Sequence, residues 1–333
     1  MLKARYNRSE PLFAMIVHDL FELSCEMNKS SVVEILTKDI NGNPVWLSRN
    51  INDYEDYVDL LLTRLWRLLY ATPTEFVQDH IPDFEKLIPR TEINCPLTID
   101  GVQKQSLSSQ LIKILRFSMI RKRIAPSLLR TLGLKSCVYC NANYAISDAW
   151  GDAYYDIDHW KPKALYPYLS ISFFNFQPSC ASCNRRKSNS DEVFFCLWND
   201  QPGTDVDMLD FKLSYLSQIK YIVFGDEEAL DISLIPSRPA DINNVMLRNV
   251  AEAKFHLNGR YKEHNDVAEE IIWKKWIYNL SYIQSLRRAL GYPLPTYVDV
   301  DRFILGTYSN PDDIHKRPLT RMIQAIAKDI GLL

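Results

Sequence analysis

Two Cys-x-x-Cys steps bracket an aspartate–histidine step near the middle of this 333-residue chain. The first pair is Cys137 and Cys140, and the second pair is Cys180 and Cys183. Each step places two thiolates on one tight turn, so the two pairs together supply the four ligands of a closed, structural zinc site. A redox-active Cys-x-x-Cys is the rival interpretation, but two pairs with about 40 residues between them favour zinc.

Four further side chains around the second pair have the chemistry of a phosphodiesterase: Asp158, His159, Asn175 and Asn184. Phosphodiester hydrolysis needs an activated water, a Lewis acid and neutralised phosphate charge. His159 has an intrinsic pKa near neutrality and can take a proton from water. Asp158 and Asn184 offer oxygen ligands for Mg²⁺ or Mn²⁺, and Asn175 can hold the loop by hydrogen bonds to the backbone.

Basic residues gather around the same segment. From Gly101 to Ser188 there are 13 Lys and Arg against 4 Asp, a balance of +9 that leaves −11 for the rest of a chain with net charge −2. This distribution predicts a local nucleic-acid surface between acidic flanks, although a basic helix can also be a solvated face. The candidate phosphate contacts are Arg121, Lys122, Arg123, Lys161, Lys163, Arg185, Arg186 and Lys187.

The sequence predicts that two short strands and a short helix position these groups. Residues 143–146 and 153–158 predict two short strands around a turn. Because Asp158 and His159 lie at the end of the second strand, the following loop can turn both side chains toward one metal. Ser179 is the predicted N-cap of the short helix that carries the second cysteine pair.

Helical patterns flank this segment on both sides. A basic helix is predicted from about Ser108 to Leu132, with Pro126 ending or kinking it. In the C-terminal third, Trp273, Trp276 and Tyr278 stand at helical spacing and are expected in a core.

The pattern as a whole predicts a mostly α-helical α+β protein with three regions. These are a helical N-terminal region (1–105), a basic helix with the metal-binding module (106–200) and a helical C-terminal region (201–333). No run of about 18 apolar residues occurs and the first residues lack a secretory signal, so no membrane partner is expected and the predicted compartment is the cytoplasm.

Between Ser136 and Ser188 the order C-x-x-C, D-H-x-x-P-K, N and C-x-x-C-N-x-x-K resembles the HNH endonucleases with a zinc-binding ββα-metal fold. The resemblance implies that His159 is the general base and that Asn175 orients the catalytic loop. It further implies that Asp158 and Asn184 bind the catalytic divalent ion. In this family the third motif position is often His, and here it is Asn184.

A second resemblance lies downstream. Residues Arg248–Tyr261 are similar to the helical extension of HNH proteins from bacterial anti-phage systems, such as the Septu-type and retron-associated nucleases that work with an ABC-type or SMC-like ATPase. This resemblance implies an effector nuclease that acts on DNA together with a partner ATPase. His256 and Arg260 are expected to pack on the nuclease module or to face DNA.

Three functional hypotheses follow. The first is a metal-dependent nuclease, the second a catalytically silent, zinc-stabilised nucleic-acid-binding or scaffold protein, and the third an effector restrained until a partner releases it. A bare zinc knuckle has no need of Asp-His, Asn and Asn in this order, so their joint presence favours an enzyme. Whether the substrate is DNA or RNA, and whether one or both strands are cut, is left open by the sequence.

Overall fold

The computed structural model describes residues 51–95, 97–99, 102–104, 106–192, 195–198, 209–290 and 299–332. The part of the predicted N-terminal helical region that precedes residue 51 lies outside them. Within these residues the chain is mostly helical, with four two-stranded antiparallel sheets. The broad prediction of a mostly helical α+β protein is therefore confirmed.

The elements follow one another along the chain in three groups. The first comprises α3 (Ile51–Tyr70), α4 (Pro73–Glu75), the π-helical turn η1 (Phe76–His80), α5 (Ile81–Leu87), α6 (Arg90–Ile93), β1 (Leu97–Ile99), β2 (Val102–Lys104), α7 (Leu107–Ile114) and α8 (Phe117–Leu132). The second comprises β3 (Ile146–Ser147), β4 (Ala153–Tyr154), β5 (Asp156–His159), the 3-10 turns η2 (Pro167–Leu169) and η3 (Phe173–Asn175), β6 (Phe176–Ser179) and α9 (Ala181–Lys187). The third comprises β7 (Leu209–Leu213), α10 (Tyr215–Phe224), η4 (Glu227–Ala229), β8 (Ile232–Pro236), α11 (Ile242–Phe255), α12 (Leu257–Lys262), α13 (Asn265–Ile277), α14 (Leu280–Leu290), α15 (Val300–Leu305), η5 (Pro311–Lys316) and α16 (Thr320–Asp329).

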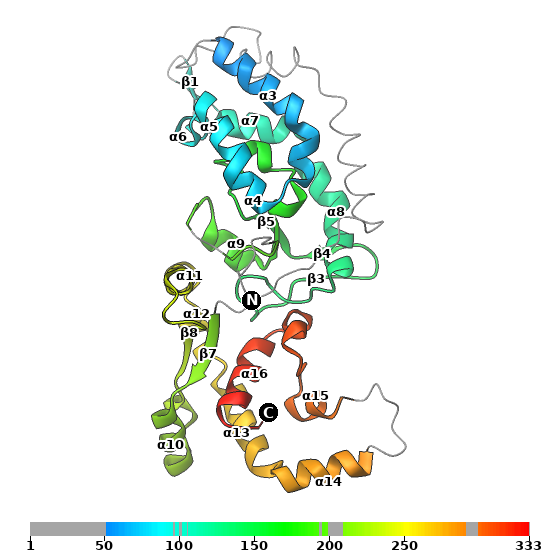
Figure 1. The fold of residues 1–333 in the computed structure, drawn as a ribbon, viewed down its shortest axis with the longest axis vertical. Helices are drawn as coiled ribbons and strands as arrows, with labels where there is room; N and C mark the ends of the chain where they lie inside the picture. Colours follow the sequence, from blue (N-terminus) through cyan, green and yellow to red (C-terminus); the bar gives the residue numbers. More distant parts are fainter. Residues whose placement is uncertain are drawn as a thin grey trace.

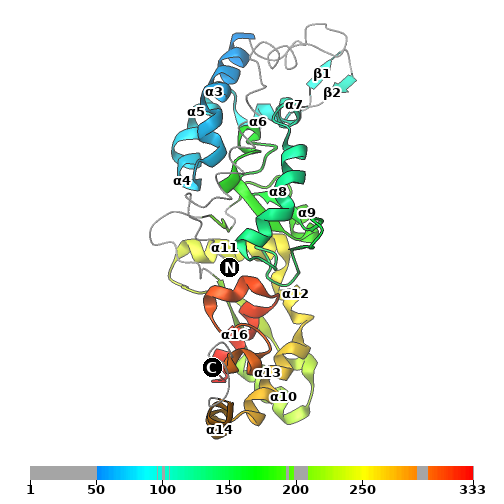
Figure 2. The ribbon, with the colours of Figure 1, turned by 90° about the vertical axis from the view of Figure 1, so that its right-hand side faces the viewer.

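These groups are stacked along one long axis (Figure 1). The helices α3 to α7 occupy one end, β3 to β6 with α9 lie in the middle, and the elements from α10 to α16 occupy the other end. The side view gives the same order, with α8 running from the first group down to the middle (Figure 2). The middle group is therefore held between two helical layers.

Aromatic packing fixes the long segment between β5 and β6 against the first group. The rings of Phe84 in α5 and Tyr168 in η2 are stacked 3.9 Å apart, and Tyr57 in α3 meets Phe84 edge-on at 5.0 Å. All three side chains are buried. Buried aromatic pairs of this kind add about 0.5–1.5 kcal/mol each beyond the burial of their area. The segment that follows His159 is thus anchored to α3 and α5.

The predicted basic helix is broken at a different residue from the one expected. Arg116, with φ 52°, lies in the left-handed region and separates α7 from α8, whereas α8 continues without interruption past residue 126. Of the two alternatives for Pro126, the one in which it ends the helix is therefore wrong. The helix ends at Gly133, whose φ of 64° is the left-handed conformation that glycine adopts without steric cost.

The third group is built on the antiparallel pair β7 and β8. α12 is fixed to β8 because the Asn258 side chain accepts a 2.6 Å hydrogen bond from the Leu234 amide.

We expected Trp273 and Trp276 in the core, and this prediction is wrong. The two side chains are 44% and 54% exposed on α13. Among the described residues, no helix combines the length and the apolar character needed to cross a membrane.

The turn that carries the first cysteine pair, residues 136–143, joins the middle group to the third, and we refer to it as the knuckle. Asn141, at φ 49°, accepts a 2.6 Å hydrogen bond from the Leu319 amide through its carbonyl and donates one of 2.9 Å to the Ile314 carbonyl through its side chain. The amide of Lys135, just before the knuckle, donates to the His315 carbonyl at 2.9 Å. One distant part of the sequence, residues 314–319, therefore closes around the knuckle.

Candidate active site and metal centre

The Asp-His step lies on a short ladder that is followed at once by a helix. β5 and β6 pair antiparallel, with Asp158 opposite Gln177 and His159 opposite Phe176, and α9 starts directly after β6. The sequence did not predict β6, and it placed the N-cap of α9 one residue early. Ser179 is the last residue of β6, and Cys180 occupies the N-cap position.

The predicted second strand is divided in the structure. β4 ends at Tyr154, and β5 begins at Asp156 and extends through His159. Because His159 is part of the ladder, its side chain and that of Asp158 point to opposite faces of the strand. The expectation that the loop turns both side chains toward one metal is therefore not met.

His159 is buried in an aromatic pocket, with 2% of its surface exposed. The rings of Phe117 and Phe176 meet the imidazole edge-on at 4.8 and 5.6 Å. Burial, with smaller contributions from nearby cations, lowers the pKa of His159 to about 3. Nε2 lies 2.9 Å from the Ser170 carbonyl, which can only accept, so Nε2 carries the proton and Nδ1 carries the lone pair of a neutral imidazole.

Asp158 is held on the other face of β5 by two partners. Its Oδ2 accepts a 2.8 Å hydrogen bond from the Tyr139 hydroxyl and lies 3.4 Å from the Lys187 ammonium. Burial raises the pKa of Asp158, and Lys187 and the hydrogen bonds oppose that rise. Lys187 also donates a 2.7 Å hydrogen bond to the His159 carbonyl. It therefore links the carboxylate to the backbone of the histidine.

Asn184 lies beside a carboxylate that the sequence argument overlooked. Its side-chain amide donates a 2.9 Å hydrogen bond to Asp156, whose other oxygen pairs with Arg121 at 3.1 Å. Asp156 and Asp158 stand two residues apart on one strand and share a face. Two carboxylates and an amide thus lie on the side of β5 toward α9, which is a donor set suited to Mg²⁺ or Mn²⁺. The alternation Asp-Ile-Asp was the signal in the sequence.

Asn175 is fully buried and bonds only to backbone groups. Its side-chain oxygen accepts from the Lys161 amide at 2.7 Å, and its nitrogen donates to the carbonyls of Lys161 and Leu169 at 3.0 Å each. The Trp160 amide in turn donates to the Asn175 carbonyl at 2.8 Å. These bonds fix the segment after His159 to the start of β6.

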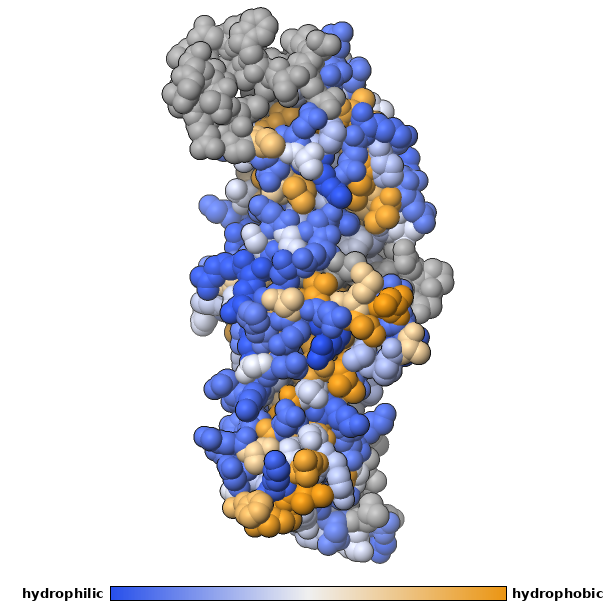
Figure 3. All heavy atoms as spheres, turned by 90° about the vertical axis from the view of Figure 1, so that its left-hand side faces the viewer, coloured by the Kyte–Doolittle hydropathy of each residue, from blue (hydrophilic) through white to orange (hydrophobic). Residues whose placement is uncertain are grey.

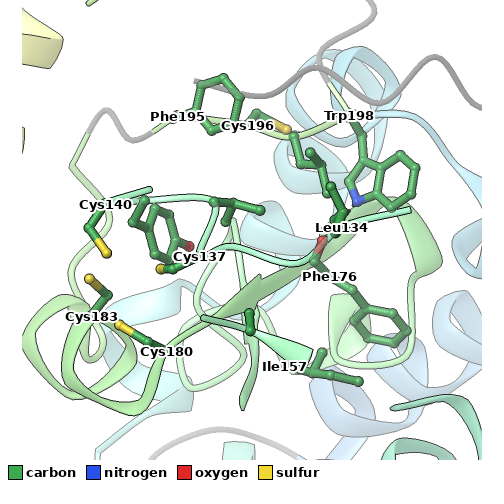
Figure 4. Packing of buried hydrophobic residues seen from close by; sticks show 14 of the residues in the cluster. Leu134, Cys137, Cys140, Ile157, Phe176, Cys180, Cys183, Phe195, Cys196 and Trp198 are labelled. Atoms are coloured by element: carbon green, nitrogen blue, oxygen red, sulfur yellow. Dashed lines mark hydrogen bonds between the residues drawn. The ribbon is translucent and has the colours of Figure 1, made fainter. Parts of the chain in front are cut away.

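The two cysteine pairs meet between the knuckle and α9 (Figure 4). Their four Sγ atoms lie within 4.8 Å of one another, and all four residues are buried and free of disulfides. A tetrahedral zinc with Zn–S bonds of about 2.3 Å places its sulfurs about 3.8 Å apart. Hydrogen bonds from the other three thiols lower the pKa of Cys180, whereas burial raises the pKa of Cys137, so the cluster favours a thiolate at Cys180. The four cysteines can therefore hold a zinc ion, and among the described residues they form the one such group of His, Cys, Asp and Glu.

Two side chains donate to the sulfurs from outside. Arg260 of α12 lies 3.2 Å from Cys183 Sγ and 3.6 Å from Cys140 Sγ, and Asn143 lies 3.4 Å from Cys180 Sγ. Burial acts against the charged guanidinium, but the cysteine sulfurs outweigh it and raise the pKa of Arg260. Of the two expectations for Arg260, packing on the central module is the one observed. The neighbouring Tyr261 hydroxyl donates to the Cys140 carbonyl and reinforces this contact.

The predicted phosphate contacts fall into three classes. Lys187 is 1% exposed and bonded to Asp158 and His159, so its prediction as a phosphate contact is wrong. Lys161 and Lys163 are half-buried: Lys161 pairs with Asp191 at 3.0 Å, and Lys163 lies 4.2 Å over the Phe117 ring. The remaining five are exposed on α8 and α9, and they are Arg121, Lys122, Arg123, Arg185 and Arg186.

The chain is 30% identical over 80 residues to the Septu protein PtuB of Bacillus thuringiensis. The match takes in 23% of this chain and 30% of PtuB, so less than a third of the relative is spanned. No protein-family model matches the chain. No solved structure matches it either.

Proposed function

We propose that this protein is a metal-dependent endonuclease of the HNH type that hydrolyses phosphodiester bonds of DNA. The observation that carries the proposal is the state of His159, a neutral imidazole with Nε2 bonded to the Ser170 carbonyl. This bond leaves the lone pair of Nδ1 as the site that can accept a proton. Because burial holds the pKa of His159 at about 3, Nδ1 can act as a base near neutral pH only once the imidazole is exposed to water. Asp158, Asp156 and Asn184 on the opposite face supply the oxygens for a divalent ion.

In the proposed reaction, Nδ1 of His159 removes a proton from water. The water oxygen then bonds to phosphorus as the bond from phosphorus to the leaving oxygen breaks. Mg²⁺ or Mn²⁺, held by Asp158 and Asn184 with Asp156 beside them, supplies charge stabilisation when bound. Arg185 and Arg186, exposed on α9 next to this donor set, bind the flanking phosphates. Zinc fills the cysteine cluster and keeps α9 in register with the knuckle.

We further propose that the described conformation is a resting state. His159 is sealed from water by Phe117, Phe176 and the Ser170 carbonyl, and Lys187 neutralises Asp158. Catalysis therefore requires the segment between Lys161 and Ser170 to move and the end of β5 to turn, so that His159 reaches the face that carries Asp158. The similarity to PtuB, together with the resemblance of Arg248–Tyr261 to anti-phage HNH proteins, supports an effector role in anti-phage defence with a partner ATPase that releases this segment.

The same burial favours a second candidate. A protein whose His159 never meets water would be a catalytically silent, zinc-stabilised nucleic-acid-binding or scaffold protein. In that case the Lys187–Asp158 pair is purely structural. The two candidates differ in whether any condition yields cleavage that depends on His159.

The test is cleavage of supercoiled plasmid by wild type and His159→Ala, with Mg²⁺ or Mn²⁺ and with EDTA, in the absence and presence of the partner ATPase. We expect metal-dependent nicking by wild type and none by His159→Ala, although both proteins contain equal zinc. Cys180→Ser should lose zinc and stability instead. Binding of Mn²⁺, followed by electron paramagnetic resonance, should weaken in Asp158→Asn without any activity being measured. Equal cleavage by His159→Ala would refute the assignment of the base.

A further inference from the structure

The outward face of α10 is apolar. Six of its ten residues are large apolar side chains between 40% and 77% exposed, and they are Tyr215, Leu216, Ile219, Ile222, Val223 and Phe224. Five of them follow the spacing i, i+1, i+4, i+7 and i+8, which places them on one continuous stripe. Single exposed apolar residues are ordinary on protein surfaces, but a contiguous stripe marks an interaction site.

The opposite face of α10 already has its partners. Ser217 and Tyr221 are buried, and the Tyr221 hydroxyl donates to Glu269 at 2.7 Å and accepts from the Trp273 indole at 2.6 Å. α10 is therefore packed on α13 by its more polar side and exposes its apolar side. Apolar side chains gather at the end of the molecule where α10 lies (Figure 3). A helix face as apolar as the outward face of α10 is normally covered.

We propose that a second copy of this chain covers the stripe, with the two α10 helices antiparallel about a two-fold axis through Ile219. In such a pair, a residue that follows Ile219 by n positions in one copy contacts the residue that precedes Ile219 by n positions in the other copy. Tyr215 then packs against Val223, Leu216 against Ile222 and Ile219 against itself, so each of the five stripe residues meets an apolar one. Self-complementarity of this kind is what a closed, isologous dimer requires.

The charges around the stripe fit the same arrangement. An acidic run, Asp226 to Glu228, follows the C-terminal end of α10, while Lys212 precedes its N-terminal end, and all four of these side chains are exposed. Antiparallel pairing brings Asp226 of one copy level with Lys212 of the other. It also places the acidic run beside the N-terminal end of the partner helix, where negative charge is stabilising. The acidic run argues against nucleic acid as the occupant of this surface.

The first test measures the mass of the full-length protein by analytical ultracentrifugation over a range of concentrations. We expect a monomer–dimer equilibrium in wild type and a dimer dissociation constant raised at least about tenfold in Ile219→Glu, because each dimer would bury two unpaired carboxylates. Ile242→Glu, an equally drastic change at a 67% exposed position on α11, is the matched control and should dimerise as wild type does. A wild type that stays monomeric throughout overturns the proposal and leaves the stripe to a different protein.

The second test locates the axis. With Cys25 and the exposed Cys95 replaced by serine, Ile219→Cys should form a disulfide between copies on mild oxidation, since the residue faces itself. Phe224→Cys, which is 77% exposed on the same helix but meets residue 214 in this pairing, should not. Equal crosslinking of the two variants would refute the antiparallel register. Neither test depends on nuclease activity, so a failed nuclease assay leaves this inference standing.

Discussion

Arg260 offers the sharpest test of the reasoning about the metal centre. Four thiolates and one divalent zinc carry a net charge of −2, and among the described residues Arg260 is the cation seen to donate to the sulfurs. Replacing Arg260 by Met keeps the length and apolar character of the stem and removes the charge. We expect zinc to bind more weakly in Arg260→Met.

The magnitude follows from the distances. Two unit charges 3.2 Å apart, as Arg260 and Cys183 are, attract by about 5 kcal/mol at an effective dielectric constant of 20. Removing the half-buried guanidinium from water offsets part of this, and hydrogen bonds to charged groups contribute about 1.5–3 kcal/mol net. Zinc affinity should therefore fall roughly 10- to 100-fold, the usual effect of losing a group that supports the ligands. Arg260→Lys keeps the charge but loses the two-pronged donation, so it should lie between Met and wild type.

The assay is competition for zinc with a chelating dye at neutral pH, together with circular dichroism to show that each variant is folded. Lys262→Met is the matched control, because Lys262 lies on the same helix, carries the same charge and is exposed. If Arg260→Met held zinc as tightly as Lys262→Met does, Arg260 would be a packing residue and the counter-ion argument would be wrong.

Four further outcomes are expected. Lys187→Met leaves Asp158 buried without its cation and should lower the free energy of unfolding in urea by about 3–5 kcal/mol, and a loss below 1 kcal/mol would contradict the pairing. Arg185→Met, by contrast, should leave stability unchanged and reduce the salt dependence of DNA binding by about one phosphate contact. Asn175→Ala leaves three buried backbone groups without their hydrogen-bond partner, and it should lower the free energy of unfolding by about 3 kcal/mol in the same urea assay. His80 is buried, and neither ring nitrogen has a hydrogen-bond partner among the described residues; burial lowers its pKa, so the folded protein takes up this proton less readily than the unfolded chain. The contribution of His80 to stability should thus be complete above the ordinary histidine pKa and fall below it by up to about 1.4 kcal/mol per pH unit. His80→Phe should remove this share of the slope and leave the share that His159 contributes.

The cysteine cluster shows what spacing alone can predict. Each Cys-x-x-Cys step constrains two sulfurs locally, so only the meeting of two turns was left to the fold, and the four sulfurs do converge. The strand ends were harder to place. β6 was missed because Phe176–Ser179 contains Pro178, is buried at every position and shows no alternation of polar and apolar residues.

Contacts between residues far apart in the sequence could not be predicted from local patterns. Arg260 is 77 residues from Cys183, and no local pattern links the two. Lys187 looked like a phosphate contact because it follows two exposed arginines, but the turn of α9 directs it inward to Asp158, 29 positions earlier in the sequence. Pro126 was expected to end or kink a helix. The helix continues past it because Ala125, Leu128 and Leu129 are buried around it, and this packing offsets the cost of an interior proline.

The closure of the knuckle by the third group sets an order of events during synthesis. The partners of Asn141 lie 173 to 180 residues downstream, and Arg260 follows Cys183 by 77 residues. At about 5–20 residues per second, the four cysteines leave the ribosome roughly 4–15 seconds before Arg260 and the knuckle precedes its last partners by about 9–36 seconds. The four cysteines are therefore available first, Arg260 second and the last partners of the knuckle third. Each new molecule passes through an interval in which the cysteine cluster is complete but the contacts from the third group are not yet made.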